Sequence, residues 1–121
     1  MARTCKVGVH GRNADRFEDM DFQVIRDAKI EAVKMMSLTN VDVFQRLKGE
    51  NPNLEIITRL HHPGFNTGGH PSPEEFVNAM TPVIAPLQPF CTQFQIHNEP
   101  NHAQRYEGWG NTDDDARSFN D

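Results

Sequence analysis

Four short apolar segments alternate along the chain with segments in which apolar residues recur every three or four positions. The short segments are rich in β-branched and long apolar residues, which is typical of strands. The wider spacing of apolar residues in the segments between them is typical of amphipathic helices. We therefore expect strands at Lys6–His10, Ala32–Ser37, Leu54–Leu60 and Thr92–His97. This alternation predicts βαβ units, and hence an α/β fold with a parallel sheet.

Helical spacing predicts a helix in each of the three intervals between the strands. The first covers Asp19–Lys29, with Phe22 and Ile25 on its apolar face. The second begins after Asn40, whose side chain can cap the first turn. It ends at Gly49, because glycine suits the left-handed position that follows many helices.

The third helix has the clearest beginning. Ser72, Pro73 and Glu75 fit a capping box, with serine as the N-cap and proline at the first helical position. Pro82 predicts a kink or an early end, because proline removes a backbone donor and clashes with the preceding turn. An acidic run at Asp113–Asp115 predicts the start of a fourth helix, since carboxylates favour the positive end of a helix dipole.

Charge and composition exclude several classes of protein. The net charge is −5 and the 12 lysines and arginines are scattered, so we expect no nucleic acid partner, which would require clustered cations. No apolar run approaches the roughly 20 residues of a membrane span, and the first residues lack the apolar stretch of a signal peptide. Cys5 and Cys91 are too few for a disulfide framework, and we expect buried thiols.

Polar, aromatic and glycine residues gather after the predicted strands, at the ends where parallel α/β barrels carry their functional groups. After the fourth strand the chain reads His97-Asn98-Glu99-Pro100-Asn101. This segment resembles the clan A retaining glycoside hydrolases, barrel enzymes whose acid/base carboxylate lies in an Asn-Glu-Pro motif ending strand four. The resemblance implies that Glu99 is the general acid/base and that Asn98 binds the sugar 2-hydroxyl.

The same resemblance implies a partial (β/α)8 TIM barrel, with residues 1–121 as its N-terminal half and a carbohydrate as substrate. The chemistry agrees with this role, because a poor leaving oxygen requires a proton from a carboxyl group at the mouth of a pocket. Tyr106 and Trp109 can stack on the apolar face of a sugar. The alternatives are an ordinary strand-ending turn at Glu99 and packing of both rings over the rim.

Histidines form a second group of candidates. His61 and His62 follow the third strand, and His10 and Arg12 follow the first, so we expect them to contact substrate, together with Arg59. For each histidine, a structural role with its ring satisfied by loop carbonyl groups is an equal alternative. We expect no metal and no cofactor, because His10-Gly11-Arg12 lacks a His-x-His pair and the adjacent His61 and His62 chelate poorly.

The chain has 121 residues, about half of the roughly 250 of a complete barrel. Retaining glycosidases need a second carboxylate about 5–5.5 Å from the first. The resemblance implies a glutamate ending strand seven, which these residues do not reach. We therefore expect a truncated barrel without turnover of its own. The alternatives are a non-catalytic carbohydrate-binding module and a half-barrel that pairs with a second copy.

Overall fold

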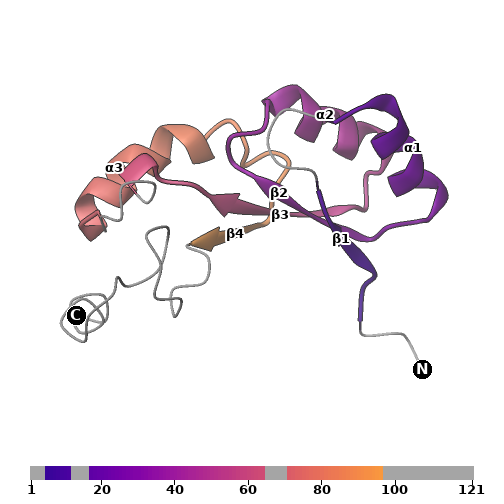
Figure 1. Ribbon diagram of the computed structural model, residues 1–121, viewed down its shortest axis with the longest axis horizontal. Helices are drawn as coiled ribbons and strands as arrows, with labels where there is room; N and C mark the ends of the chain where they lie inside the picture. The colour runs from indigo at the N-terminus through magenta and orange to yellow at the C-terminus, as the bar shows by residue number, and fades with distance from the viewer. Residues whose placement is uncertain (1–4, 12–16, 65–70, 97–121) are drawn as a thin grey trace.

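A computed structural model describes residues 5–11, 17–64 and 71–96. These residues form an α/β fold with a four-stranded parallel sheet in the order β1-β2-β3-β4 and three helices (Figure 1). The predicted alternation of strands and helices is confirmed. The elements are β1 (Gly8–His10), α1 (Asp19–Asp27), β2 (Ala32–Met36), α2 (Val41–Glu50), β3 (Glu55–Leu60), α3 (Pro73–Ile84) and β4 (Gln93–Ile96).

The strands are shorter than predicted. β1 begins two residues after Lys6, because the Val7 N–H group donates to the Glu31 carboxylate at 2.8 Å and is thus bound by a side chain. β2 ends before Ser37, and β3 and β4 each begin one residue later than expected. The predicted last residue of β4, His97, lies outside the described residues.

α1 also ends earlier than predicted, at Asp27. Lys29 has a φ of 52°, a left-handed conformation that reverses the chain towards β2 and cannot continue a helix. The beginning of α1 has a capping box that the sequence analysis missed. The Glu18 N–H group donates to the Asp21 carboxylate at 2.8 Å, and the Glu18 side chain accepts from the Asp21 N–H group.

The predicted beginning of α2 is confirmed, whereas its predicted end is wrong. The Asn40 side-chain oxygen accepts a hydrogen bond from the Asp42 N–H group at 3.1 Å. Gly49 lies inside the helix, which continues to Glu50. Pro52 accounts for the end, because a proline disfavours helical backbone at the preceding residue, Asn51.

The capping box of α3 is confirmed. The Glu75 N–H group donates to Ser72 Oγ at 3.3 Å, and the Ser72 N–H group donates to Glu75 Oε2 at 2.8 Å. The helix continues through Pro82 to Ile84, so it ends two residues beyond the predicted position. Pro82 lies in the last turn of α3, where its missing N–H group removes one helical hydrogen bond near the end of the helix.

The core lies between the sheet and the helices α1 and α2, which lie side by side over one face (Figure 1). Val33 and Met35 of β2 alternate with half-buried residues and pack against Phe44 and Leu47 of α2, all four at 0% exposure. Cys91 joins this core, as expected for a buried thiol. Cys5 is exposed, contrary to prediction, since it precedes β1 and no described helix covers it.

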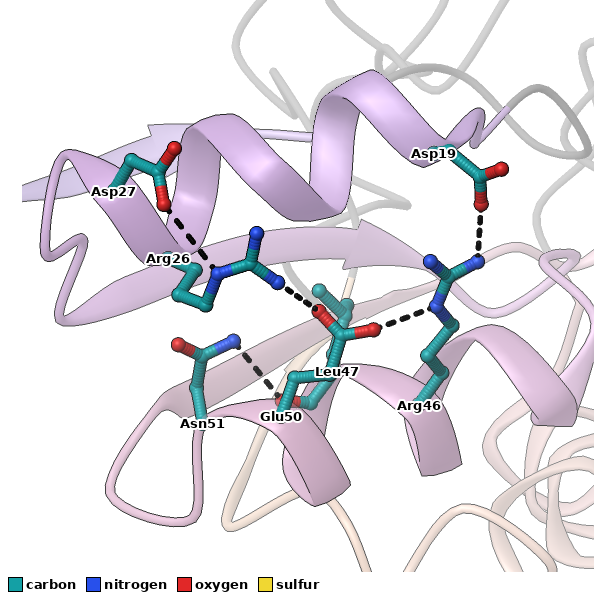
Figure 2. A network of polar contacts seen from close by, with 7 residues as sticks. All are labelled: Asp19, Arg26, Asp27, Arg46, Leu47, Glu50 and Asn51. Atoms are coloured by element: carbon teal, nitrogen blue, oxygen red, sulfur yellow. Dashed lines mark hydrogen bonds and ion pairs between the residues drawn. The ribbon is translucent and has the colours of Figure 1, made fainter.

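A network of charged side chains joins α1 to α2 outside the core (Figure 2). The Arg46 guanidinium donates to Asp19 Oδ1 and to Glu50 Oε1, both at 2.7 Å, and lies 3.9 Å from the centre of the Phe22 ring. Arg26 reaches the second oxygen of Glu50 at 3.3 Å. Glu50 thus binds one arginine from each helix.

Candidate functional site

The carboxyl ends of the four strands lie at one edge of the sheet, because all three strand pairs are parallel. β1 ends at His10 and β3 ends directly before His61, so both predicted histidines lie at this edge. β2 lies between their strands. The carboxyl edge is therefore the candidate functional site, as the sequence predicts for a parallel α/β unit.

His10 is exposed and has one ring nitrogen engaged. Its Nδ1 lies 2.7 Å from the carbonyl oxygen of Gly11. A carbonyl accepts but cannot donate, so Nδ1 carries the hydrogen of this bond. In the neutral ring Nε2 then has a lone pair, which can accept a hydrogen bond from a ligand hydroxyl group.

Gly11 is needed where β1 leaves the sheet. Its N–H group donates to the Lys34 carbonyl oxygen at 2.8 Å, which continues the β1–β2 pairing past His10. A Cβ at this position would lie 2.9 Å from Met35 Sδ and 3.0 Å from both the Lys34 carbonyl oxygen and the Phe17 ring. The absence of a side chain therefore permits the close approach that positions His10.

Ser37 positions His61, a role that the sequence analysis missed. The Ser37 hydroxyl oxygen accepts from the His61 N–H group at 3.0 Å, and the Ser37 N–H group donates to the Arg59 carbonyl oxygen at 2.9 Å. Ser37 is 8% exposed, so these bonds lie in a protected environment. A serine directly after a buried strand is the signal that would have indicated such a bridge.

His62 is bound by its own loop. Its Nδ1 accepts from the Gly64 N–H group at 3.0 Å, and its ring lies 6.0 Å from that of Phe76 at the beginning of α3. When Nδ1 accepts this bond it has no hydrogen, and the hydrogen of the ring then lies on Nε2. His62 is thus bound by its loop through an N–H group, and not through the carbonyl group that the alternative expected.

The remaining predicted site residues, Arg12, Asn98, Glu99, Tyr106 and Trp109, lie outside the described residues. Ile96, the last residue of β4, pairs with Leu60 in the sheet, and His61 follows Leu60. The segment with Asn98 and Glu99 follows Ile96 directly in the sequence.

A shallow depression lies at the opposite, amino-terminal edge of the sheet, lined among others by Arg26, Lys29, Glu31 and Glu50. Its charged groups are already engaged in part, because Glu50 binds Arg26 and Arg46. We give it no catalytic role, since functional groups in parallel α/β folds collect at the carboxyl edge.

Within residues 5–11, 17–64 and 71–96, no cluster of three histidine, cysteine or acidic side chains could hold a metal ion. Over the same residues, no helix has the length and apolar character needed to cross a membrane.

In comparisons with known proteins, the chain matches no family model, no curated protein and no solved structure.

Proposed function

We propose that the chain is the N-terminal half of a (β/α)8-barrel retaining glycoside hydrolase, with Glu99 as its general acid/base. One observation carries the proposal. The sheet is parallel and in sequential order, so β4 ends at the edge where His10 and His61 lie. An Asn-Glu-Pro motif directly after such a strand is at the position where the resembling enzymes have their acid/base.

The arrangement of the layers supports a barrel over a doubly wound sheet. In doubly wound folds the strand order reverses and helices cover both faces. Here the order is β1-β2-β3-β4 without reversal, and α1 and α2 cover the same face (Figure 1). This is the pattern of strands that close into a barrel with the helices outside.

In the proposed reaction, the Glu99 carboxyl group gives its proton to the glycosidic oxygen while the bond from that oxygen to the anomeric carbon breaks. A second carboxylate takes the sugar as a covalent ester. Glu99, now ionised, accepts a proton from water as the water attacks and releases the sugar. Asn98 donates to the 2-hydroxyl group, and His10 Nε2 can accept from another hydroxyl group.

The test uses a protein in which these residues are joined to strands that carry the second carboxylate. Glu99→Ala should slow hydrolysis of alkyl glycosides about 100-fold or more, because their leaving oxygen needs a proton. Dinitrophenyl glycosides, whose leaving group needs no proton, should still form the covalent intermediate at nearly the normal rate. Rates of both steps, measured in a stopped-flow instrument, distinguish acid catalysis from general damage.

Glu107→Ala is the matched control, since it removes a carboxyl group from the same segment of sequence. It should leave both substrates nearly unaffected. Normal hydrolysis of alkyl glycosides by the Glu99→Ala variant would rule out the assignment of the acid/base.

Exposed apolar side chains at both ends of the sheet favour a second candidate function, self-assembly as a half-barrel. Val7 and Val9 are 48% and 40% exposed at the β1 end, and Ile96 is 67% exposed at the β4 end. Strand edges of this kind pair readily with other strands. Sedimentation of the purified chain distinguishes the two candidate functions. Self-assembly requires a dimer, which the substitutions Val9→Lys and Ile96→Lys should disrupt.

A further inference from the structure

Among the described strand residues, the sheet face opposite α1 and α2 carries more basic than acidic side chains. We call it the open face, because no described helix covers it. Strand alternation and register assign its side chains, since register partners in a parallel sheet point to the same face. They are Gly8, His10, Ala32, Lys34, Met36, Glu55, Ile57, Arg59, Gln93 and Gln95.

Lys34 is the most informative residue of the open face. It lies in the interior strand β2, is half-buried, and pairs in register with His10 on one side and Ile57 on the other. Within the described part of the chain, its ammonium group forms no hydrogen bond or ion pair with any residue. The ammonium nitrogen itself is accessible to water, so it can bind an anionic group of a ligand.

The one acidic residue of the open face is already neutralised. Glu55 lies one row nearer the amino-terminal edge than Lys34, where its register partner is Ala32, and its carboxylate forms an ion pair with Lys6. Arg59 lies one row nearer the carboxyl edge, with Gln95 as its partner. Arg59 has an interaction partner of its own, so Lys34 is the cationic side chain on which the argument for the carboxyl half of this face depends.

Lys34 lies close to the candidate site. β1 ends at His10, in the same row as Lys34, and the His10 ring is exposed there. Neighbouring strands are about 4.8 Å apart, so His10 and Lys34 can contact different groups of one ligand, a hydroxyl group at His10 Nε2 and an anionic group at Lys34. His10 Nε2 and the Lys34 ammonium group are the two atoms available to that ligand.

We infer that the substrate is an acidic sugar, a uronic acid residue whose carboxylate binds Lys34 beside His10. The inference rests on the proposed glycosidase function and adds the substrate class. A carboxylate accepts charge-assisted hydrogen bonds from an ammonium group, whereas the hydroxymethyl group of a neutral sugar offers Lys34 only a neutral acceptor. A second copy of the chain is a less suitable occupant of the open face, because its own open face would place a second Lys34 beside the first.

The test is titration calorimetry of the purified chain with trimers of galacturonate, glucuronate and mannuronate, each paired with its methyl ester. The ester has the same sugar and linkage without the charge. At least one acidic trimer should bind about tenfold more tightly than its ester, and Lys34→Met should remove this difference. Lys29→Met, which removes an exposed lysine at the amino-terminal edge, should leave binding unchanged.

Each other result overturns the inference. Equal binding of acid and ester, unaffected by Lys34→Met, would show that the substrate is neutral and would leave the proposed glycosidase function intact. Binding of neutral oligosaccharides alone would have the same meaning. A change of oligomeric state in Lys34→Met, measured by sedimentation, would assign Lys34 to a protein carboxylate. Failure of every sugar to bind would overturn the inference, whereas the glycosidase function depends on the Glu99→Ala rates.

Discussion

Thr58 and Cys91 show how a single polar contact is accommodated in an apolar core. Thr58 Oγ1 lies 3.0 Å from Cys91 Sγ, and both residues are buried. Burial raises the pKa of the Cys91 thiol, while the hydrogen bond with Thr58 and the charge of Lys48 act in the opposite direction with smaller effect. Cys91 is therefore a neutral thiol near pH 7, and a neutral thiol is a poor nucleophile.

The first prediction concerns this thiol. The Cys5→Ser variant keeps only Cys91, and the Cys91→Ala variant keeps only Cys5. Cys91 should react with a disulfide reagent at least 100-fold more slowly than Cys5, because its reaction requires both opening of the core and ionisation of the thiol. The pKa of the Cys91 thiol is raised in the folded state, so the protonated thiol stabilises the fold. This contribution is complete below the ordinary thiol pKa and is lost as the pH rises through the raised value. Absorbance of the released thiolate measures both rates, and equal rates would contradict the buried position.

Single residues also show what sequence reasoning can and cannot reach at the site. It assigned His10 and His61 to one edge of the sheet, because their distance from strand ends is visible in the sequence. It could not distinguish His61 from His62, since their difference depends on Ser37 and Gly64, whose hydrogen bonds form only after folding. Lys34 was overlooked because a lysine inside an apolar strand gives no indication of an unpaired charge.

Helix ends were predictable where a side chain makes the cap and unpredictable where the backbone does. Asn40 and Ser72 are both confirmed as N-caps, since their side chains have the geometry to accept from the first turn. The predicted end of α2 at Gly49 was wrong, because glycine permits a left-handed helix end without requiring one. At the end of α1, Lys29 adopts the left-handed conformation, and nothing in its side chain distinguishes it from a helical lysine.

The second prediction tests the capping box of α3. Ser72→Ala should lower the free energy of unfolding by about 1 kcal/mol, because it leaves a first-turn N–H group without its acceptor. Ser72→Gly should cost less, since glycine at the N-cap leaves that group accessible to water. Urea unfolding followed by circular dichroism measures both variants, and an unchanged midpoint in Ser72→Ala would show that α3 forms without this cap.

The same cap has a pH dependence, since hydrogen bonds from the backbone and side chain of Ser72 lower the pKa of Glu75. A lowered carboxyl pKa stabilises the fold above the ordinary carboxyl value, and this contribution is lost as the pH falls through the lowered value. Glu75→Gln should therefore show a smaller loss of stability between pH 6 and pH 3 than the wild type. Glu74→Gln is the control, because Glu74 is exposed beside it.

At the scale of the whole molecule, two kinds of interaction hold the helices in place, and they differ in strength. The apolar contacts of α2 with the sheet were visible in the sequence as a helical stripe, and Leu47 has no exposed surface. The ion network of α1 and α2 was not visible, because it joins residues up to 27 positions apart. Glu50 and Asp19 raise the pKa of Arg46 further, so its charge is present throughout the usual pH range.

The adjacent residues Arg46 and Leu47 allow the two contributions to be compared in one helix. Leu47→Ala should lower the free energy of unfolding by about 2–5 kcal/mol, because it opens a cavity in the core. Arg46→Met should lower it less, since exposed ion pairs are weak, and methionine keeps the apolar stem over Phe22. In 1 M NaCl the effect of Arg46→Met should shrink while that of Leu47→Ala persists, because salt screens charges over about 3 Å and leaves packing intact. Denaturation midpoints in urea, at low and high salt, measure all four values. If Arg46→Met were the more damaging change, the network between α1 and α2, and not the apolar core, would be what determines the stability of the sheet.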